Sequence, residues 1–349
     1  MTPRERWLAL FNHQKPDRIP TDIWATPEVY QKLYKHTGTN NRYELSEKLY
    51  IDSWRSALPL HTVHHHPEDA KANIWGLRFR NVEYAGGSSQ EAENTPLAHM
   101  EDAEELDDYH WPNPDDVDWD KTAEQIDLMP EDRIICGGHY EPFLLYCWMR
   151  GTEKAMMDLA DNPDFAFEAL DRIFEYHLEV NRRMWEVGEG RIDVMYMAED
   201  LGSQTSLLMS RRKIQEFILP YQKEMADCAR SYGVHIFYHS DGAIHSVIPD
   251  LINITGIEIL NPLEGRCTGM ELDRLAADFG DKLIFHGGID NQQTLAYGDV
   301  QEVRNEVLKA VGIFAGKRWI CAPCHNLQPV SPVENIITLY ETIHAHGKL

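Results

Sequence analysis

Residues 234–244 read V-H-I-F-Y-H-S-D-G-A-I, an apolar run that ends in side chains able to bind a metal or move a proton. Side chains two residues apart in a strand share a face, so His239 and Asp241 are expected to point the same way. Gly242 follows them and lets the chain turn sharply. A single pair of this kind also occurs as a buried histidine oriented by a carboxylate, so its meaning depends on whether the pattern recurs.

The pattern recurs from residue 133 to residue 326. Apolar strands that end in polar groups alternate there with helical patterns, and a further strand, T-D-I-W, is expected at 21–24. This alternation predicts parallel strands joined by crossover helices, because strands buried on both faces read as continuous apolar runs. The predicted strands after residue 133 are R-I-I-C-G-G-H-Y-E (133–141), D-V-M-Y-M-A-E-D-L-G (193–202), H-I-F-Y-H-S-D-G (235–242), I-E-I-L-N-P-L-E (257–264), L-I-F-H-G-G-I-D (283–290) and W-I-C-A-P-C-H-N (319–326).

The polar groups at the strand ends favour a closed barrel over an open doubly wound sheet. In a barrel all carboxyl ends meet at one mouth, whereas an open sheet uses only the ends beside its switch point. No G-x-G-x-x-G or G-x-x-x-x-G-K-[ST] motif supports nucleotide binding. We therefore predict an α/β fold, a (β/α)8 TIM barrel, as a single domain over residues 1–349 with an elaborated N-terminal region at 40–130. The end groups are His139 and Glu141, Glu199 and Asp200, His239 and Asp241, Asn261 and Glu264, His286 and Asp290, and Cys324 and His325.

Two stretches in the elaborated region have an unusual composition. The run H-T-V-H-H-H (61–66) carries four histidines, but consecutive histidines splay apart, so a loop is expected there rather than a metal site. Residues 101–120 are densely acidic, which predicts a solvated connector.

Composition excludes several classes of partner. The 349-residue chain has 33 basic and 57 acidic side chains, a net charge of −24, which repels nucleic acid and anionic membranes. No signal peptide or membrane-spanning stretch is recognisable, so we expect a cytoplasmic protein. Six scattered cysteines do not form a disulfide framework and are expected to be reduced. The sequence does not indicate the oligomeric state.

Five segments resemble a known family, in the order in which that family carries them. They are P-R-E-R-W-L-A-L-F-N-H-Q-K-P-D-R-I-P-T-D (3–22), Y-H-W-P-N-P-D-D (109–116), E-D-L-G-S-Q (199–204), Y-H-S-D-G (238–242) and C-H-N-L-Q-P-V-S-P-V-E-N (324–335). Together they resemble the uroporphyrinogen decarboxylase superfamily, which also includes cobalamin-dependent methyltransferases. The resemblance implies a TIM barrel, in agreement with the strand pattern.

Within that superfamily, the chain is more similar to the methyltransferase branch. Uroporphyrinogen decarboxylases carry an arginine-rich M-R-Q-A-G-R-Y-type segment that grips substrate carboxylates, whereas the corresponding residues here, D-I-W-A-T-P-E-V-Y (22–30), contain no arginine. The methyltransferases hold zinc with an H-x-C pair and a later cysteine. By this resemblance His239 matches the histidine, Asp241 stands in place of the first cysteine, and His325 in place of the later one, with Cys324 as a further ligand candidate. Two histidines and a carboxylate are harder ligands than thiolates and suit zinc or another divalent ion.

The other strand-end groups are candidates for catalysis and substrate binding. Repulsion between Glu199 and Asp200 is expected to raise one pKa and so create a general acid or base, although one of the two should face the wall because neighbouring strand residues point in opposite directions. His139, Glu141, Gln204, Asn261 and His286 are candidates for orienting a substrate.

The leading hypothesis is a metal-dependent methyltransferase that works with a corrinoid protein and a small thiol, pterin or methoxylated compound. Two alternatives stay open. One is a decarboxylase or related lyase without a metal, in which Asp200 or Asp241 protonates a carbanion-like intermediate. The other is a non-catalytic protein that binds the corrinoid partner.

Overall fold

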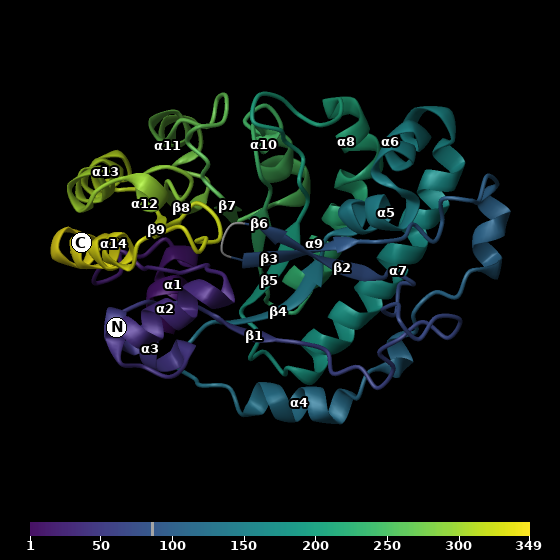
Figure 1. Cartoon of the computed structure of the whole chain (residues 1–349), viewed down its shortest axis with the longest axis horizontal. Coiled ribbons are helices and arrows are strands. Elements are labelled where there is room, and N and C mark those ends of the chain that lie inside the picture. The colour runs from purple at the N-terminus through teal and green to yellow at the C-terminus, as the bar shows by residue number, and fades with distance from the viewer. Residues whose placement is uncertain (85–86) are drawn as a thin grey trace.

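A parallel sheet forms the centre of the computed structural model, which describes residues 1–84 and 87–349. Within these ranges, seven strands pair in parallel with each neighbour, in the order β1-β4-β5-β6-β7-β8-β9. Helices surround the strands (Figure 1). The strands are β1 (Arg55–Ala57), β4 (Ile135–Tyr140), β5 (Val194–Ala198), β6 (His235–His239), β7 (Ile259–Asn261), β8 (Ile284–Ile289) and β9 (Trp319–Pro323). The predicted alternation of parallel strands and helices is confirmed.

Residues 21–25 lie beside β9, the last strand in the order given above. Thr21 and Ala25 form isolated parallel bridges with Cys321 and Leu327. The amide of Asp52, three residues before β1, donates a hydrogen bond of 2.8 Å to the carbonyl oxygen of Thr21. The segment predicted as a strand at 21–24 therefore bonds to β9 and to Asp52, although it is not itself a continuous strand.

The helices begin at residues that suit a first turn. Thr2 caps α1, since its hydroxyl oxygen accepts a 3.1 Å hydrogen bond from the Glu5 amide while the Glu5 carboxylate accepts one of 2.7 Å from the Thr2 amide. Proline opens α1, α2, α5 and α7, where its missing N–H has no consequence. The α-helices are α1 (Pro3–Phe11), α2 (Pro27–Thr37), α3 (Arg42–Leu49), α4 (Trp119–Asp127), α5 (Pro142–Arg150), α6 (Thr152–Asp161), α7 (Pro163–Val187), α8 (Arg211–Phe217), α9 (Leu219–Ser231), α10 (Ile248–Asp250), α11 (Leu272–Phe279), α12 (Thr294–Tyr297), α13 (Val300–Ile313) and α14 (Val333–His346). Short helical segments of other types are η1 (Ala103–Asp108), η2 (Pro114–Asp116) and η3 (Leu251–Thr255).

The core has an inner and an outer part. Trp7, Leu10 and Phe11 of α1 pack against inward-facing residues near the start of the strands, such as Val194 and Phe237. A larger cluster fills the space between the outer face of the sheet and the helices. Because α1 covers the amino ends of the strands, the carboxyl ends are the open side on which polar side chains can gather.

The N-terminal region adds structure of its own to the barrel-like core. Strands β2 (Phe79–Tyr84) and β3 (Gly87–Ala92) pair antiparallel as a separate sheet. The histidine-rich run contacts the acidic connector, since His61 bridges to Val117. Its four histidines belong to none of the groups of three potential metal ligands found in the described ranges.

The structure also bears on the cysteines and on membrane-spanning helices. All six cysteines lie in the described ranges and are free. No helix in those ranges combines the length and apolar character needed to cross a bilayer.

Candidate metal site at the carboxyl ends of the strands

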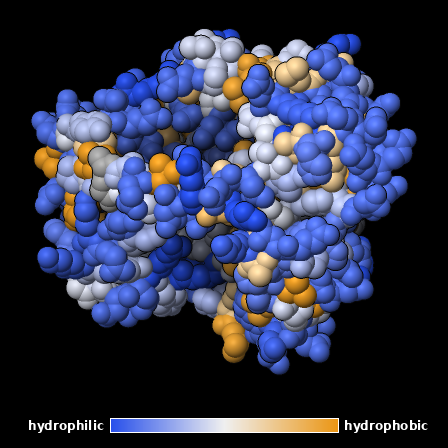
Figure 2. Space-filling model, turned by 45° about the vertical axis from the view of Figure 1, so that its right-hand side comes forward, coloured by the Kyte–Doolittle hydropathy of each residue, from blue (hydrophilic) through white to orange (hydrophobic). Residues whose placement is uncertain are grey.

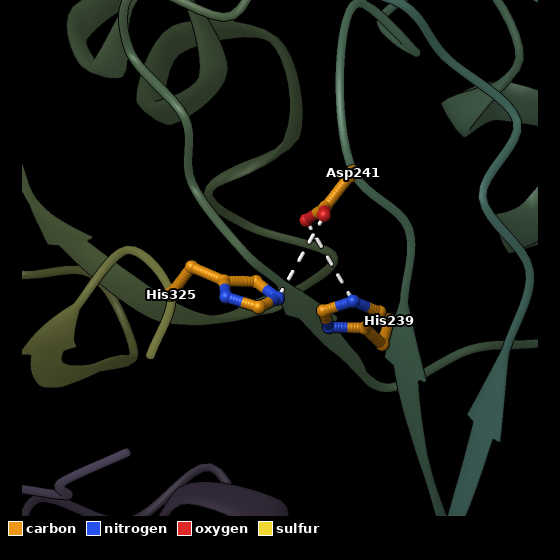
Figure 3. A group of neighbouring side chains, drawn as sticks. All are labelled: His239, Asp241 and His325. Atoms are coloured by element: carbon orange, nitrogen blue, oxygen red, sulfur yellow. Dashed lines mark ion pairs between the residues drawn. The ribbon is translucent and has the colours of Figure 1, made fainter. Parts of the chain in front are cut away.

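Three predicted ligands meet where β6 and β9 end (Figure 3). His239 is the last residue of β6, Asp241 follows two residues later, and His325 lies just after β9. One ligand atom from each residue lies within 4.8 Å of those of the other two. The Nε2 atoms of His239 and His325 are 3.6 and 3.7 Å from the two carboxylate oxygens of Asp241. The predicted group therefore converges on one point.

The hydrogen-bonding capacity of the Asp241 carboxylate is only partly used. Its Oδ1 atom is buried and has no hydrogen-bond partner among the described residues. Burial raises the pKa of Asp241 to about 7; His325 opposes this effect, and the nearby carboxylates of Asp200 and Glu264 add to it. A carboxylate with one buried oxygen that has no partner, and with an imidazole nitrogen facing each of its two oxygens, fits a divalent cation, because the cation would supply the missing partner and the missing positive charge.

A buried hydrogen-bond chain orients the His239 ring. His239 Nδ1 donates to Asn261 Oδ1 at 2.6 Å, and Asn261 Nδ2 donates to His286 Nδ1 at 2.7 Å. The Asn261 amide nitrogen also faces the carbonyl oxygen of His286 at 3.4 Å, which defines how the amide is turned. His286 Nε2 then donates to Asp22 Oδ2 at 2.9 Å. With its Nδ1 proton held by Asn261, His239 presents the lone pair of Nε2 to Asp241, as a metal ligand requires.

Asp22 ends the chain as a carboxylate. Burial works to raise the pKa of Asp22, but hydrogen bonds from His286, Ser53 and the Ile23 amide outweigh it and hold that pKa below its usual value. The indole of Trp24 also donates to Asp22, at 3.0 Å. Sequence reasoning did not assign Asp22 to the site. The available signal was an acidic residue in the T-D-I-W segment, one more polar group beside an apolar strand.

Glu199 and Asp200 face opposite sides, as adjacent residues after a strand should. Glu199 is 1% exposed and accepts hydrogen bonds of 2.9 Å from the amides of Phe143 and Leu144 at the start of α5. Its pKa is raised well above the usual value by burial and by repulsion from Glu141, in spite of those two amides. Asp200 instead faces the site: its Oδ1 accepts a 3.0 Å hydrogen bond from the Asp241 amide and is 3.9 Å from His239 Nε2.

Cys324 points away from the three ligands. Its Sγ donates a 3.0 Å hydrogen bond to the Leu263 carbonyl oxygen, and burial raises the pKa of its thiol. A buried thiol of raised pKa is a poor source of thiolate, so the geometry favours His325 over Cys324 as the third ligand.

The predicted substrate-orienting residues separate into exposed and buried groups. His139 is exposed, stacks on Tyr196 with ring centroids 5.5 Å apart, and lies 3.6 Å from Glu141. Gln204 is exposed and lines a separate cavity of about 560 Å³. Asn261 and His286 are each 0% exposed. Direct contact of these five residues with a substrate stays a prediction, and the structure favours a positioning role for Asn261 and His286.

Aromatic rings form one wall of the site. The Trp24 ring lies 5.7 Å from His239 and 6.4 Å from His325, and Tyr196 lies 5.7 Å from His239. Trp24 and Tyr196 also line a cavity of about 540 Å³ that runs toward β1 and α3. The face in Figure 2 is mostly hydrophilic and is hollowed near its centre. The site is therefore a cluster of possible ligands beside a space large enough for a small molecule.

A family model and one solved structure agree with this fold. The family model described as uroporphyrinogen decarboxylase (URO-D) matches residues 81–346. A solved methyltransferase from Methanosarcina mazei is similar over 99% of each chain, with 18% sequence identity and a TM-score of 0.71. A D-tagatose 3-epimerase-like protein is similar over 68% of this chain and 85% of its own, with 13% identity and a TM-score of 0.36. No curated protein sequence matches the chain.

Proposed function

Because the chain belongs to the uroporphyrinogen decarboxylase (URO-D) family, we propose that it is a metal-dependent methyltransferase, which moves a methyl group between a corrinoid protein and a small acceptor or donor. The observation that carries this proposal is the meeting of His239, Asp241 and His325 within 4.8 Å. The fold shared with the Methanosarcina mazei methyltransferase supports it. The acceptor or donor would be a small thiol, pterin or methoxylated compound.

In this proposal His239, Asp241 and His325 hold a divalent ion, with zinc as the first candidate. The chemistry that such an ion would supply is a lowered pKa for a bound thiol, hydroxyl or water, which makes a better nucleophile at neutral pH. The chain's own residues prepare the site for it. Asn261 holds the His239 proton on Nδ1, and the aromatic wall limits the access of water from one side.

Asp200 is the proposed proton-transfer group. It is 41% exposed, lies beside His239, and is oriented by the Asp241 amide. Glu199, which is tied to the start of α5, would position the strand end rather than meet a substrate. His139 and Glu141, at the end of β4, would contact the substrate beside Tyr196, on which the His139 ring stacks.

Closure of the barrel and the cellular location of the protein are also proposals. We infer that residues 21–25 complete an eight-stranded barrel, because they bond to β9 and to Asp52 beside β1. The free cysteines support a reducing, cytoplasmic location.

A metal-independent carboxy-lyase is the second candidate, and one observation favours it. The pKa of about 7 at Asp241 leaves part of this carboxyl protonated near neutral pH, so that it can donate a proton to a carbanion. In that reaction Asp241 would need no bound ion.

Metal analysis separates the two candidates. We expect the purified protein to bind about one equivalent of zinc, His239→Ala to lose most of that affinity, and His245→Ala, a histidine paired with Asp278 outside the group, to retain it. Elemental analysis and competition with a chromophoric chelator provide the measurement. Absence of stoichiometric metal, unchanged by His239→Ala, would contradict the methyltransferase proposal.

The same proteins should be assayed for methyl transfer from methylcobalamin to a panel of thiols. Turnover that depends on His239 supports an enzyme. Binding of a corrinoid protein without turnover for any acceptor would favour the non-catalytic alternative.

A further inference from the structure

The cavity of about 540 Å³ connects the metal site with a group of arginines. Trp24 and Tyr196, which also pack on His239, form part of its wall, and Asn326 next to His325 forms another part. At the other end the cavity reaches Arg42 at the start of α3 and Arg55 at the start of β1. A molecule that fills the cavity would thus contact both the arginines and the neighbourhood of the proposed ligands.

Neither arginine forms an ion pair with a carboxylate within residues 1–84 and 87–349. In the part of the chain that the structure describes, ion pairs engage many arginines but include neither Arg42 nor Arg55, and the buried Nη2 atom of Arg55 has no hydrogen-bond partner. The Arg42 guanidinium lies 4.3 Å from the centre of the Tyr30 ring, and that of Arg55 lies 5.3 Å from the Tyr43 ring. This is unusual in a chain with 57 acidic and only 33 basic residues, where a partner would be easy to supply.

A third arginine, Arg133, lies near enough to Arg55 to repel it. Burial and repulsion from Arg133 lower the pKa of Arg55, although Tyr43 and Asp132 oppose that effect. Arg133 itself is engaged by the Glu47 carboxylate and by the Ile51 carbonyl oxygen. Arg133 is therefore already paired, and a bound anion would instead supply the partner that the buried Nη2 atom of Arg55 lacks among the described residues.

The carboxylate within the cavity does not neutralise these arginines. Asp22 lines it but is 2% exposed, and its oxygens are occupied by His286, Trp24, Ser53 and the Ile23 amide. The acidic groups Asp200 and Glu264 belong instead to the side of the mouth that surrounds Asp241. The site is therefore polarised, with acids around the proposed ligands and uncompensated cations at the far end of the cavity.

We propose that Arg42 and Arg55 form an anion-binding subsite for the carboxylate of an organic substrate, whose other end reaches the His239–Asp241–His325 group. Guanidinium groups bind carboxylates through paired, charge-assisted hydrogen bonds, and the rings of Trp24, Trp54 and Tyr196 offer flat surfaces for the body of the molecule. The assignment of this anion as the substrate rests on the proposed function, whereas anion binding does not. Phosphate shares the oxyanion chemistry and is the other source to be tested.

Titration calorimetry on the full chain tests the subsite, with and without added zinc. The probes are benzoate, glutarate and inorganic phosphate, and benzamide serves as the neutral analogue. We expect a carboxylate to bind more tightly than phosphate and benzamide, Arg55→Gln and Arg42→Gln to weaken binding by at least tenfold, and Arg304→Gln, an exposed arginine on α13, to leave it within twofold.

Several outcomes would overturn the proposal. They are no binding of any anion, equal binding of benzamide, an equal loss in Arg304→Gln, or tighter binding of phosphate than of either carboxylate. If Arg55→Gln fails to fold, the exposed Arg42 provides the deciding variant. Zinc affinity of the wild-type protein, measured on the same samples, separates the two hypotheses. If the wild-type protein binds zinc but no anion, the subsite alone is rejected; if it binds a carboxylate but no zinc, the metal site alone is rejected.

Discussion

At the scale of single residues, Asn261 determines how His239 can act. Its amide oxygen accepts a hydrogen bond from the Nδ1–H of His239, and its amide nitrogen donates one to Nδ1 of His286. No other neutral side chain offers an acceptor and two donors in so small a volume. The tautomer of His239, and with it the lone pair on Nε2, therefore depends on a residue that is completely buried.

Replacement of Asn261 tests this dependence. We expect Asn261→Leu, which keeps the side-chain volume, to lower zinc affinity by about 10- to 100-fold, since loss of a residue that orients a metal ligand has effects of this order. Chelator competition measures the affinity, and circular dichroism checks the fold. Asn305→Ala on the exposed face of α13 is the control. Unchanged affinity in Asn261→Leu would show that the His239 ring is held by other contacts.

At the scale of elements, helix α7 places a partly buried histidine against the N-terminal region. His177 stacks on Trp75 with ring centroids 5.3 Å apart, and its Nδ1 donates to the Ile173 carbonyl oxygen at 2.8 Å. Burial lowers the pKa of His177 from 6.5 to about 4, with a smaller opposing effect from that hydrogen bond. The contact between α7 and the segment around Trp75 is thus sensitive to acid.

The sign of the pH effect follows from this lowered pKa. Between pH 6.5 and about 4 the unfolded chain binds a proton at His177 and the folded chain does not, so the free energy of unfolding falls as the pH falls. We expect His177→Phe, which keeps the aromatic stack, to reduce that dependence by up to about 1.4 kcal/mol per pH unit in this window. Urea unfolding at several pH values measures it. Identical slopes for both proteins would mean that His177 titrates normally in the folded state.

At the scale of the whole molecule, α1 closes the amino ends of the strands and leaves the carboxyl ends for chemistry. Trp7 is 0% exposed, donates a 2.9 Å hydrogen bond to the Asp52 carbonyl oxygen, and packs 5.8 Å from Trp54 and 6.1 Å from His286. The first helix therefore contacts the segment before β1 and the base of the hydrogen-bond chain.

Truncation of Trp7 should weaken the whole fold. We expect Trp7→Ala to reduce the free energy of unfolding by about 3–5 kcal/mol, the range for large buried aromatic residues. Trp148→Ala, whose side chain on α5 is 38% exposed, should have a smaller effect. Urea denaturation provides both values. Equal losses in the two variants would indicate that α1 is only peripheral to the core.

Much of the fold was predictable from local patterns. The alternation of apolar strands and helices indicates a parallel sheet, and the two-residue period of a strand places His239 and Asp241 on one face. The same rule says that one of Glu199 and Asp200 must face the wall, but only the amides at the start of α5 determine that it is Glu199.

The sequence alone determined which residues lie at the strand ends, because the two-residue period of a strand is visible in neighbouring residues. Tertiary structure decided which of them meet. Asp22 and His286, 264 residues apart, share a hydrogen bond, and His325 rather than Cys324 turns toward Asp241. Arg42 and Arg55 line the same cavity, which no sequence motif predicts. Such contacts depend on how distant segments pack around a common core, and that packing is set by the whole chain at once rather than by the residues nearby.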